Sequence, residues 1–115
     1  MFKRQYRIQS GVRITSSQAI ATPFFHLKKG LNHLAVSRFG FVVSKKIDKR
    51  AVVRNRTRRV LRSIVEDLFP DIKTGFDLLF IIKKPIEKRT EELEKEVKDV
   101  LEKAGISIND KAENF

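Results

Sequence analysis

The chain has 115 residues, of which 41% are hydrophobic, and it contains no cysteine. This length suits one compact domain with a modest core, and the missing cysteines exclude disulfide bonds and thiolate metal sites. The formal net charge of +11 at pH 7 favours a polyanionic partner rather than a small-molecule substrate. Apolar runs stay below the roughly 18 residues of a membrane-spanning helix, and the first residues lack the apolar stretch of a secretory signal. We therefore expect a single domain over residues 1–115, located in the cytoplasm and without a membrane partner.

The positive charge is concentrated in the first half of the chain. Residues 1–62 carry sixteen Lys or Arg and one acid, whereas residues 63–115 carry nine Lys or Arg and thirteen acids. The densest part is residues 38–62, which contain ten basic residues and a single acid, Asp48. Basic residues release condensed counterions when they neutralise phosphates. This segment therefore predicts a nucleic-acid-binding surface.

The sequence before this basic segment predicts a short helix and a strand. Residues 2–9 are expected to form one or two helical turns that end near Gly11, because glycine tolerates positive φ. Residues 23–28, PFFHLK, have the aromatic content and alternation of a strand that starts with proline, and residues 28–32 are expected to turn. Residues 38–44 alternate as a half-buried strand does. We expect the two strands to pair antiparallel.

Residues 51–69 change to helical periodicity. The apolar side chains fall in one sector of the helix, and the basic ones fan across the opposite side. The apolar set is Val53, Val60, Leu61, Ile64 and Leu68, with Val65 at its edge. The polar set is Arg54, Asn55, Arg58, Arg59 and Arg62. Pro70 is expected to end the helix.

The remaining sequence predicts one strand and one helix. Residues 76–82, FDLLFII, form a short and nearly continuous apolar run, which is typical of a buried central strand. A helix follows from Thr90 as N-cap to a terminating Gly105, and residues 106–115 are expected to fray. The order, a possible α followed by β, β, α, β, α, indicates an α/β (α+β) two-layer sandwich with helices on one face of the sheet. In it, the basic helix connects two strands of the same sheet.

A run of charge on a helix is often only a solvated face. Here the basic side chains of residues 53–62 have no acid among them, and like charges one turn apart repel each other by a few tenths of a kcal/mol per pair (~0.2–0.5). An anion would relieve that repulsion. Asn55, between arginines, adds an amide that both donates and accepts hydrogen bonds, as phosphate, ribose and base edges require. We therefore favour nucleic-acid binding for this helix.

Three segments of the chain resemble the protein subunit of bacterial ribonuclease P. They are SRFGFVVSKK at residues 37–46, AVVRNRTRRVLR at 51–62 and GFDLLFIIKKP at 75–85, in this order and at compatible spacing. The resemblance covers about residues 24–103, and its most specific part is the Arg-Asn-Arg sequence at 54–56 after a Val-Ser-Lys-Lys strand. It implies an α/β sandwich with a mixed sheet, in which the Arg-Asn-Arg helix lies in a left-handed βαβ crossover. General topology rules alone predict the right-handed form.

The resemblance also implies an activity and its partners. Members of this family bind a catalytic RNA and help it to remove the 5′ leader from precursor tRNA, and the Mg²⁺ used in the chemistry is held on the RNA subunit. The residues expected to bind RNA are Arg38, Lys45, Lys46, Lys49, Arg50, Arg54, Asn55, Arg56, Arg58, Arg59 and Arg62. We expect no catalytic residue, no metal site and no cofactor in the protein itself.

Family members also hold the single-stranded leader in a cleft between the first helix and the sheet, with aromatic and basic side chains. The candidates in this chain are Phe2, Tyr6, Phe24, Phe25, Phe39 and Phe41. For most of these phenylalanines a place in the core is the favoured alternative, because alternate strand positions must fill the space under the helices. The resemblance further implies that the first helix is shortened in this chain.

The sequence offers little for a nuclease that works without RNA. Such an enzyme needs clustered carboxylates for its metal ions, and residues 1–62 contain only Asp48. His26 and His33 have no ligand-like neighbours in the sequence and are expected to be ordinary strand or surface residues. The alternative function is a ribosomal or ribosome-associated RNA-binding protein of the same fold. A sequence-specific DNA regulator is disfavoured, because the basic helix lacks the partner helix of a helix-turn-helix motif.

Overall fold

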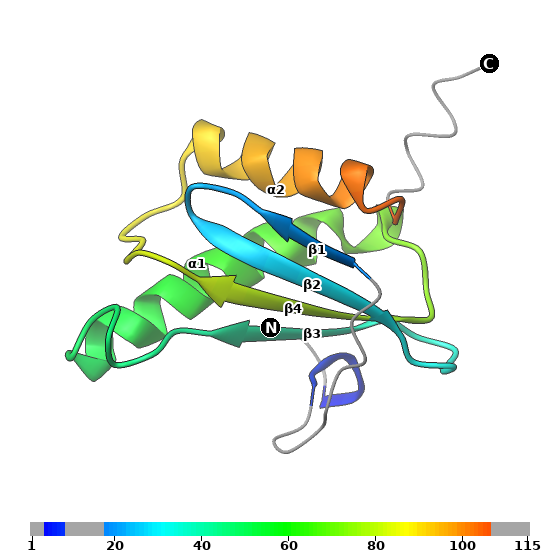
Figure 1. The fold of residues 1–115 in the computed structure, drawn as a ribbon, viewed down its shortest axis with the longest axis horizontal. Helices are drawn as coiled ribbons and strands as arrows, with labels where there is room; N and C mark the ends of the chain where they lie inside the picture. The colour runs from blue at the N-terminus through cyan, green and yellow to red at the C-terminus, as the bar shows by residue number, and fades with distance from the viewer. Residues whose placement is uncertain (1–3, 9–17, 107–115) are drawn as a thin grey trace.

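The computed structural model describes residues 4–8 and 18–106, which form a two-layer α/β sandwich (Figure 1). Its four-stranded sheet has the order β1-β2-β4-β3, and its two α-helices are α1 and α2. The strands are β1 (Gln18–Ala21), β2 (Phe25–Leu31), β3 (Arg38–Val42) and β4 (Phe76–Ile82). The helices are α1 (Ala51–Leu68) and α2 (Glu91–Lys103), and short 3₁₀ turns form η1 (Arg4–Tyr6) and η2 (Phe69–Asp71). The predicted fold class is confirmed.

The sheet is mixed because β4 enters between the two strands that precede the basic helix. β4 pairs antiparallel with β2 and parallel with β3, and α1 makes the crossover that parallel neighbours require. The prediction that the strands at 23–28 and 38–44 pair with each other is therefore wrong. The central place goes to β4, whose continuous apolar run suits a strand with a neighbour on each side. The handedness of the β3–α1–β4 crossover stays a prediction.

Two further differences concern the strands before the basic helix. β2 continues to Leu31, where a turn over residues 28–32 is predicted, and β1 is not predicted at all. The strand continues through both lysines because they lie on opposite faces: Lys28 is exposed, whereas Nζ of Lys29 donates to the carbonyl oxygen of Ala104 at the end of α2, at 2.6 Å. β1 escapes prediction because its four residues, QAIA, are too few to show a period.

The core lies between the sheet and both helices. Figure 1 shows α1 crossing behind the strands and α2 running along the sheet above it. On the sheet side the buried residues are Phe25, Leu27, Phe39, Leu78, Phe80 and Ile82, and the helices contribute Leu61, Ile64, Leu93, Val97 and Leu101. The rings of Phe25 and Phe80 lie 5.2 Å apart, and the ring of Phe41 stacks on Phe80 at the same separation. One hydrophobic cluster thus joins all of these elements.

The basic helix is attached to the rest of the molecule through its middle. Thr57, fully buried between the arginines, donates from Oγ1 to the carbonyl oxygens of Val53 and Ile86, and it accepts from the backbone nitrogen of Ile86 at 3.0 Å. The sequence places Val60 and Leu68 in the apolar sector, but both are only half-buried. Thr57 thus joins α1 to the loop before α2, as Arg89 of the same loop does through Asp67 and the carbonyl oxygen of Ser63.

We expect Thr57→Val to lower the free energy of unfolding by about 1–3 kcal/mol, because it leaves the buried backbone nitrogen of Ile86 without an acceptor. Chemical denaturation followed by circular dichroism measures the change. Ser63→Ala is the matched control, since Oγ of Ser63 donates to the carbonyl oxygen of Val60, one turn back in the same helix. A Thr57→Val protein as stable as this control would contradict the attachment role.

The C-terminal helix has the predicted boundaries. Oγ1 of Thr90 accepts from the backbone nitrogen of Leu93 at 3.1 Å, as an N-cap does, and Gly105 ends the helix with a φ of 74°. Ile106, the first residue of the predicted frayed tail, is not frayed. Ile106 is fully buried, and its carbonyl oxygen accepts from the backbone nitrogen of Lys73 at 2.8 Å. Residues 107–115 lie outside the described part of the chain.

The N-terminal segment lies beside β3 (Figure 1). Its described part is one 3₁₀ turn, η1, in place of the helix predicted over 2–9, followed by a parallel bridge between Arg7 and Phe39. The backbone nitrogen of Ile8 donates to the carbonyl oxygen of Phe39 at 2.9 Å. A Cβ on Gly40 would come within 3.2 Å of Ile8, so the glycine allows this close approach. The predicted helix end near Gly11 falls outside the described residues.

Candidate nucleic-acid interface

The predicted RNA-binding residues form an exposed surface on α1 and on the loop before it. Most of their side chains are exposed: Lys45, Lys46, Lys49, Arg50, Asn55, Arg56 and Arg59. Arg54, Arg58 and Arg62 are half-buried. The helix begins directly after the loop, so one continuous element carries all ten of these side chains. We call this set the basic surface.

Two arginines of the basic surface organise the start of α1. Arg50 binds the carboxylate of Asp48 through three hydrogen bonds, from its backbone nitrogen at 2.9 Å, from Nε at 3.1 Å and from Nη2 at 3.0 Å. Nη1 of Arg54 donates to the carbonyl oxygens of Asp48 and Lys49, at 3.0 and 2.8 Å. The hydrogen bonds from Arg50 hold the pKa of Asp48 below its usual value. The one acid of the segment is therefore used to shape the loop that presents Lys45, Lys46 and Lys49.

Arg58 and Arg62 lie against the molecule rather than free in solvent. Nη2 of Arg58 donates to the amide oxygen of Asn55, which steadies both side chains on the helix surface. The guanidinium of Arg62 lies over the ring of Phe41, 5.8 Å from its centroid. Burial lowers the pKa of Arg62, and the positive charges of neighbouring arginines act in the same direction, while Glu66 opposes them. A charge that is partly desolvated and repelled by its neighbours is favourably placed to take an anion.

Arg38 has a different surrounding from the rest of the predicted set. Its Nε and Nη2 donate to the two carboxylate oxygens of Asp77 at 2.8 and 2.7 Å, and Nδ2 of Asn32 donates to the same carboxylate at 3.1 Å. Asp77 is 5% exposed. Arg38 is thus committed to a buried ion pair between β3 and β4, and we remove it from the proposed RNA-binding residues. A buried carboxylate leaves its nearest cation little freedom to bind elsewhere.

The aromatic leader candidates are divided by the structure. Phe25 and Phe39 are at most 2% exposed and belong to the core, which is the alternative that the sequence favours for most of these phenylalanines. Phe41 faces the helices between Phe80 and Arg62. Phe24 is half-buried, with Nζ of Lys84 4.2 Å from its ring centroid, and Tyr6 packs edge-on against Phe69 at 4.7 Å. Phe2 lies outside the described residues. Tyr6 and Phe24 therefore retain enough exposure to meet a base.

The sheet face opposite α1 and α2, here the outer face, carries side chains that the sequence interpretation did not select. The strand register places Val42, Leu79 and Ile81 there, beside His26 and Lys28. Val42 is 44% exposed, and Leu79 and Ile81 are half-buried. The continuous apolar run of β4 predicts burial on both faces, whereas Leu79 and Ile81 on the outer face are only half-buried. Among the described elements, only the N-terminal segment approaches this face, through Ile8 over Gly40.

Arg7 is another residue that sequence reasoning missed. It lies in a segment of mixed composition, and only its backbone pairing with Phe39 brings it next to β3 and the arginines of α1. No spacing rule connects residue 7 with residue 62, so the sequence contained no usable signal.

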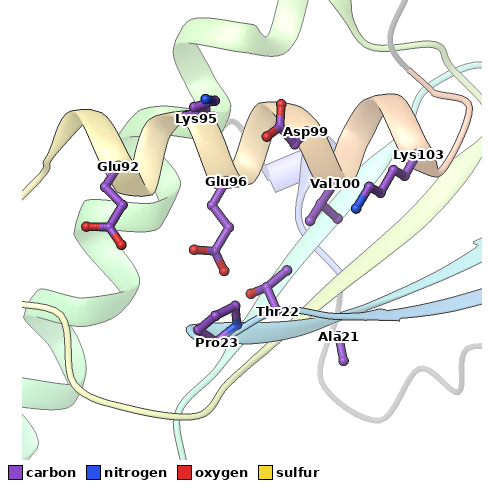
Figure 2. Close-up of a pocket in the computed structure, with 9 residues that line it drawn as sticks. All are labelled: Ala21, Thr22, Pro23, Glu92, Lys95, Glu96, Asp99, Val100 and Lys103. Atoms are coloured by element: carbon purple, nitrogen blue, oxygen red, sulfur yellow. The ribbon is translucent and has the colours of Figure 1, made fainter.

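A cavity lined by three carboxylates lies between α2 and the β1–β2 connection. Figure 2 shows Glu92, Glu96 and Asp99 on α2 above Thr22 and Pro23, around a cavity of about 320 Å³. Oε1 of Glu96 accepts from the backbone nitrogen of Phe24 at 3.3 Å. Within the described residues, no three His, Cys, Asp or Glu side chains are grouped to hold a metal ion. The three carboxylates outnumber the two lysines, Lys95 and Lys103, that also line the cavity, so it is less favourable for an anion than the basic surface.

Fold and surface together define a class, the small α/β sandwiches that present a strongly basic crossover helix. The family model for Ribonuclease P matches residues 2–105. This chain belongs to the ribonuclease P protein family. None of the described helices has the length and apolar content to cross a membrane.

Individual relatives agree with this assignment. The ribonuclease P protein component of Microcystis aeruginosa is 44% identical over 71 residues, and that of Thermoanaerobacter pseudethanolicus is 42% identical over 67 residues. These matches cover 61% and 58% of this chain but only 59% and 57% of the relatives, so the chain spans little more than half their length. The Staphylococcus aureus RNase P protein structure is 26% identical with a TM-score of 0.75, covering 89% of this chain and 97% of that one. The names of these relatives support the ribonuclease P interpretation over the ribosomal alternative.

Proposed function

We propose that this chain is the protein subunit of a ribonuclease P and binds the catalytic RNA through its basic surface. The observation that carries the proposal is the exposed, almost acid-free set of cations on α1 and its preceding loop, in a chain that belongs to the ribonuclease P family. Guanidinium groups form charge-assisted, often bidentate bonds with phosphate. Arg56 and Arg59, exposed on α1, are the side chains best placed to make them.

The proposed substrate is precursor tRNA, with its single-stranded leader held near the outer face and the N-terminal segment. Unpaired bases stack on aromatic rings and apolar surfaces, while cations follow the backbone. Tyr6 and Phe24 supply half-buried rings, and Leu79, Ile81 and Lys28 supply an apolar strip with a cation on the outer face. Phe25, Phe39 and Phe41 serve the core and are not part of this proposal.

The chemistry is assigned to Mg²⁺ ions held on the RNA subunit. Phosphodiester hydrolysis uses metal ions that stabilise the attacking and leaving oxygens, and among the described residues no three His, Cys, Asp or Glu side chains are grouped to hold a metal ion. What this chain contributes is binding: it neutralises phosphates where RNA strands approach each other and positions the leader. The proposed location of the assembly is the cytoplasm.

We expect the purified chain to leave precursor tRNA uncut on its own and, when added to a bacterial ribonuclease P RNA, to lower the Mg²⁺ concentration required for cleavage. The physical reason is that protein cations replace part of the Mg²⁺ that otherwise screens RNA phosphates. Single-turnover cleavage across a Mg²⁺ titration, with and without the chain, measures this effect. An equally basic α/β protein of another family is the control. Cleavage by RNA-free protein, or an unchanged Mg²⁺ requirement, would overturn the proposal.

A further inference from the structure

The N-terminal segment brings a cation to the edge of the sheet beside the basic helix. Arg7 bridges to Phe39, and the hydrogen bond from the backbone nitrogen of Ile8 to Phe39 fixes the segment along β3. One residue earlier, the ring of Tyr6 packs against Phe69, just after α1. Arg7 itself is exposed. Its backbone is therefore anchored on both sides while its guanidinium reaches solvent.

The arginines of α1 approach the same edge. Phe39 and Phe41 are both on the helix-facing side of β3, two residues apart, and the guanidinium of Arg62 lies over Phe41. A parallel bridge puts the side chains of paired residues on the same side, so Arg7 and Arg62 lie on one side of this edge. Arg58 and Arg59, one turn before Arg62, complete a group that we call the edge cluster: Arg7, Arg58, Arg59 and Arg62.

The charges of the edge cluster are not balanced by the protein. Arg7, Arg58 and Arg59 all disfavour the charge on Arg62, and the carboxylate of Glu66 favours it. Four guanidinium groups against one carboxylate leave a net charge of about +3 in a small area, and each like pair costs a few tenths of a kcal/mol (~0.2–0.5) when exposed. An anion that touches both the N-terminal segment and α1 removes this repulsion.

We propose that the edge cluster is a phosphate-binding site in which Arg7 and the α1 arginines, Arg59 and Arg62, clasp one RNA phosphodiester across the edge of β3. The site rests on the proposed function, because the RNA that reaches it is the one bound along α1. It extends the basic surface onto a second element, distant in the sequence. Binding also has a mechanical result: the phosphate ties the N-terminal segment to α1 and closes the bridge between Arg7 and Phe39 more firmly.

The first test is the affinity of the chain for a bacterial ribonuclease P RNA, with Arg7→Gln compared with Lys98→Gln. Each variant loses one positive charge, but Lys98 is exposed on α2, outside the basic surface. We expect Arg7→Gln to weaken binding about tenfold and to reduce the slope of log K against log salt by about one, as for the loss of one phosphate contact. Arg7→Lys should recover part of the affinity. Equal affinities for Arg7→Gln and Lys98→Gln would overturn the proposal.

The second test uses inorganic phosphate alone and follows hydrogen exchange of the Ile8 amide. Phosphate should slow this exchange in the wild-type chain and not in Arg7→Gln, because only the wild type can be tied across the edge. If neither saturating phosphate nor RNA changed the exchange rate of the Ile8 amide in the wild-type chain, the proposed site would also be overturned. The variant Arg56→Gln, outside the edge cluster, distinguishes failure of this site from failure of the proposed function. If the proposed function is wrong, Arg56→Gln leaves the RNA affinity unchanged. If it is right, Arg56→Gln weakens RNA binding and leaves the effect of phosphate on the Ile8 amide intact.

Discussion

Replacing Arg56 and Arg59 together by glutamine is expected to weaken binding of the catalytic RNA by about 3–6 kcal/mol, since each exposed guanidinium makes a charge-assisted bond of roughly 1.5–3 kcal/mol. The slope of log K against log salt should fall by about two, because two phosphate contacts are lost. Filter binding or fluorescence titration at several salt concentrations measures both quantities. Glutamine keeps the helical propensity and the length of the side chain, so the effect is one of charge and geometry.

The matched control is Lys95→Gln with Lys98→Gln. Both lysines are exposed on α2, on the half of the chain that carries the acids, and the double variant has the same net charge as the α1 variant. If the RNA were bound only by general electrostatic attraction, the two double variants would lose the same RNA affinity. The basic surface predicts a large loss for one and almost none for the other. The thermal melts should match wild type in both cases, because all four side chains are exposed.

The second large effect concerns folding. Arg38→Ala is expected to lower the free energy of unfolding by about 2–4 kcal/mol at pH 7, because it leaves the buried carboxylate of Asp77 with Asn32 as its remaining partner. The loss is somewhat below that of a fully buried pair, since the Arg38 side chain is 19% exposed. Urea denaturation measures the change. The double variant Arg38→Met with Asp77→Leu should be more stable than Arg38→Ala, because it removes both charges.

This effect depends on pH in a stated direction. Burial tends to raise the pKa of Asp77, but the hydrogen bonds from Arg38 and Asn32 and the charge of Arg38 outweigh it, so the folded-state pKa is lowered. A carboxyl group whose pKa is lowered by folding stabilises the folded state at pH values above its unfolded-state pKa of about 3.9. This contribution is lost as the pH falls through the folded-state pKa. The deficit of Arg38→Ala relative to wild type should therefore be largest at neutral pH and shrink below about pH 4. A deficit that is constant from pH 7 to pH 3 would show that Arg38 acts by packing.

The sequence by itself determined the features that depend on neighbouring residues. The helical period of the apolar residues predicts α1, and the nearly continuous apolar run predicts β4, both almost to the residue, while the cap chemistry of Thr90 and Gly105 bounds α2. The exposed cations of α1 follow from the same pattern, since the face opposite an apolar stripe must meet water. These predictions succeed because every interaction behind them spans a few positions along the chain.

Only the tertiary structure decided which distant residues meet. β4 separates β2 from β3, Arg38 is held by Asp77 across 39 positions, and Arg7 joins the arginines of α1 through a bridge to Phe39. The same aromatic alternation that predicts a strand over 38–44 is compatible with either face pointing to the core. It is the helices packed on one face that bury Phe39 and leave Val42 outside. Strand order and facing depend on the free energy of the whole core, which no local pattern encodes.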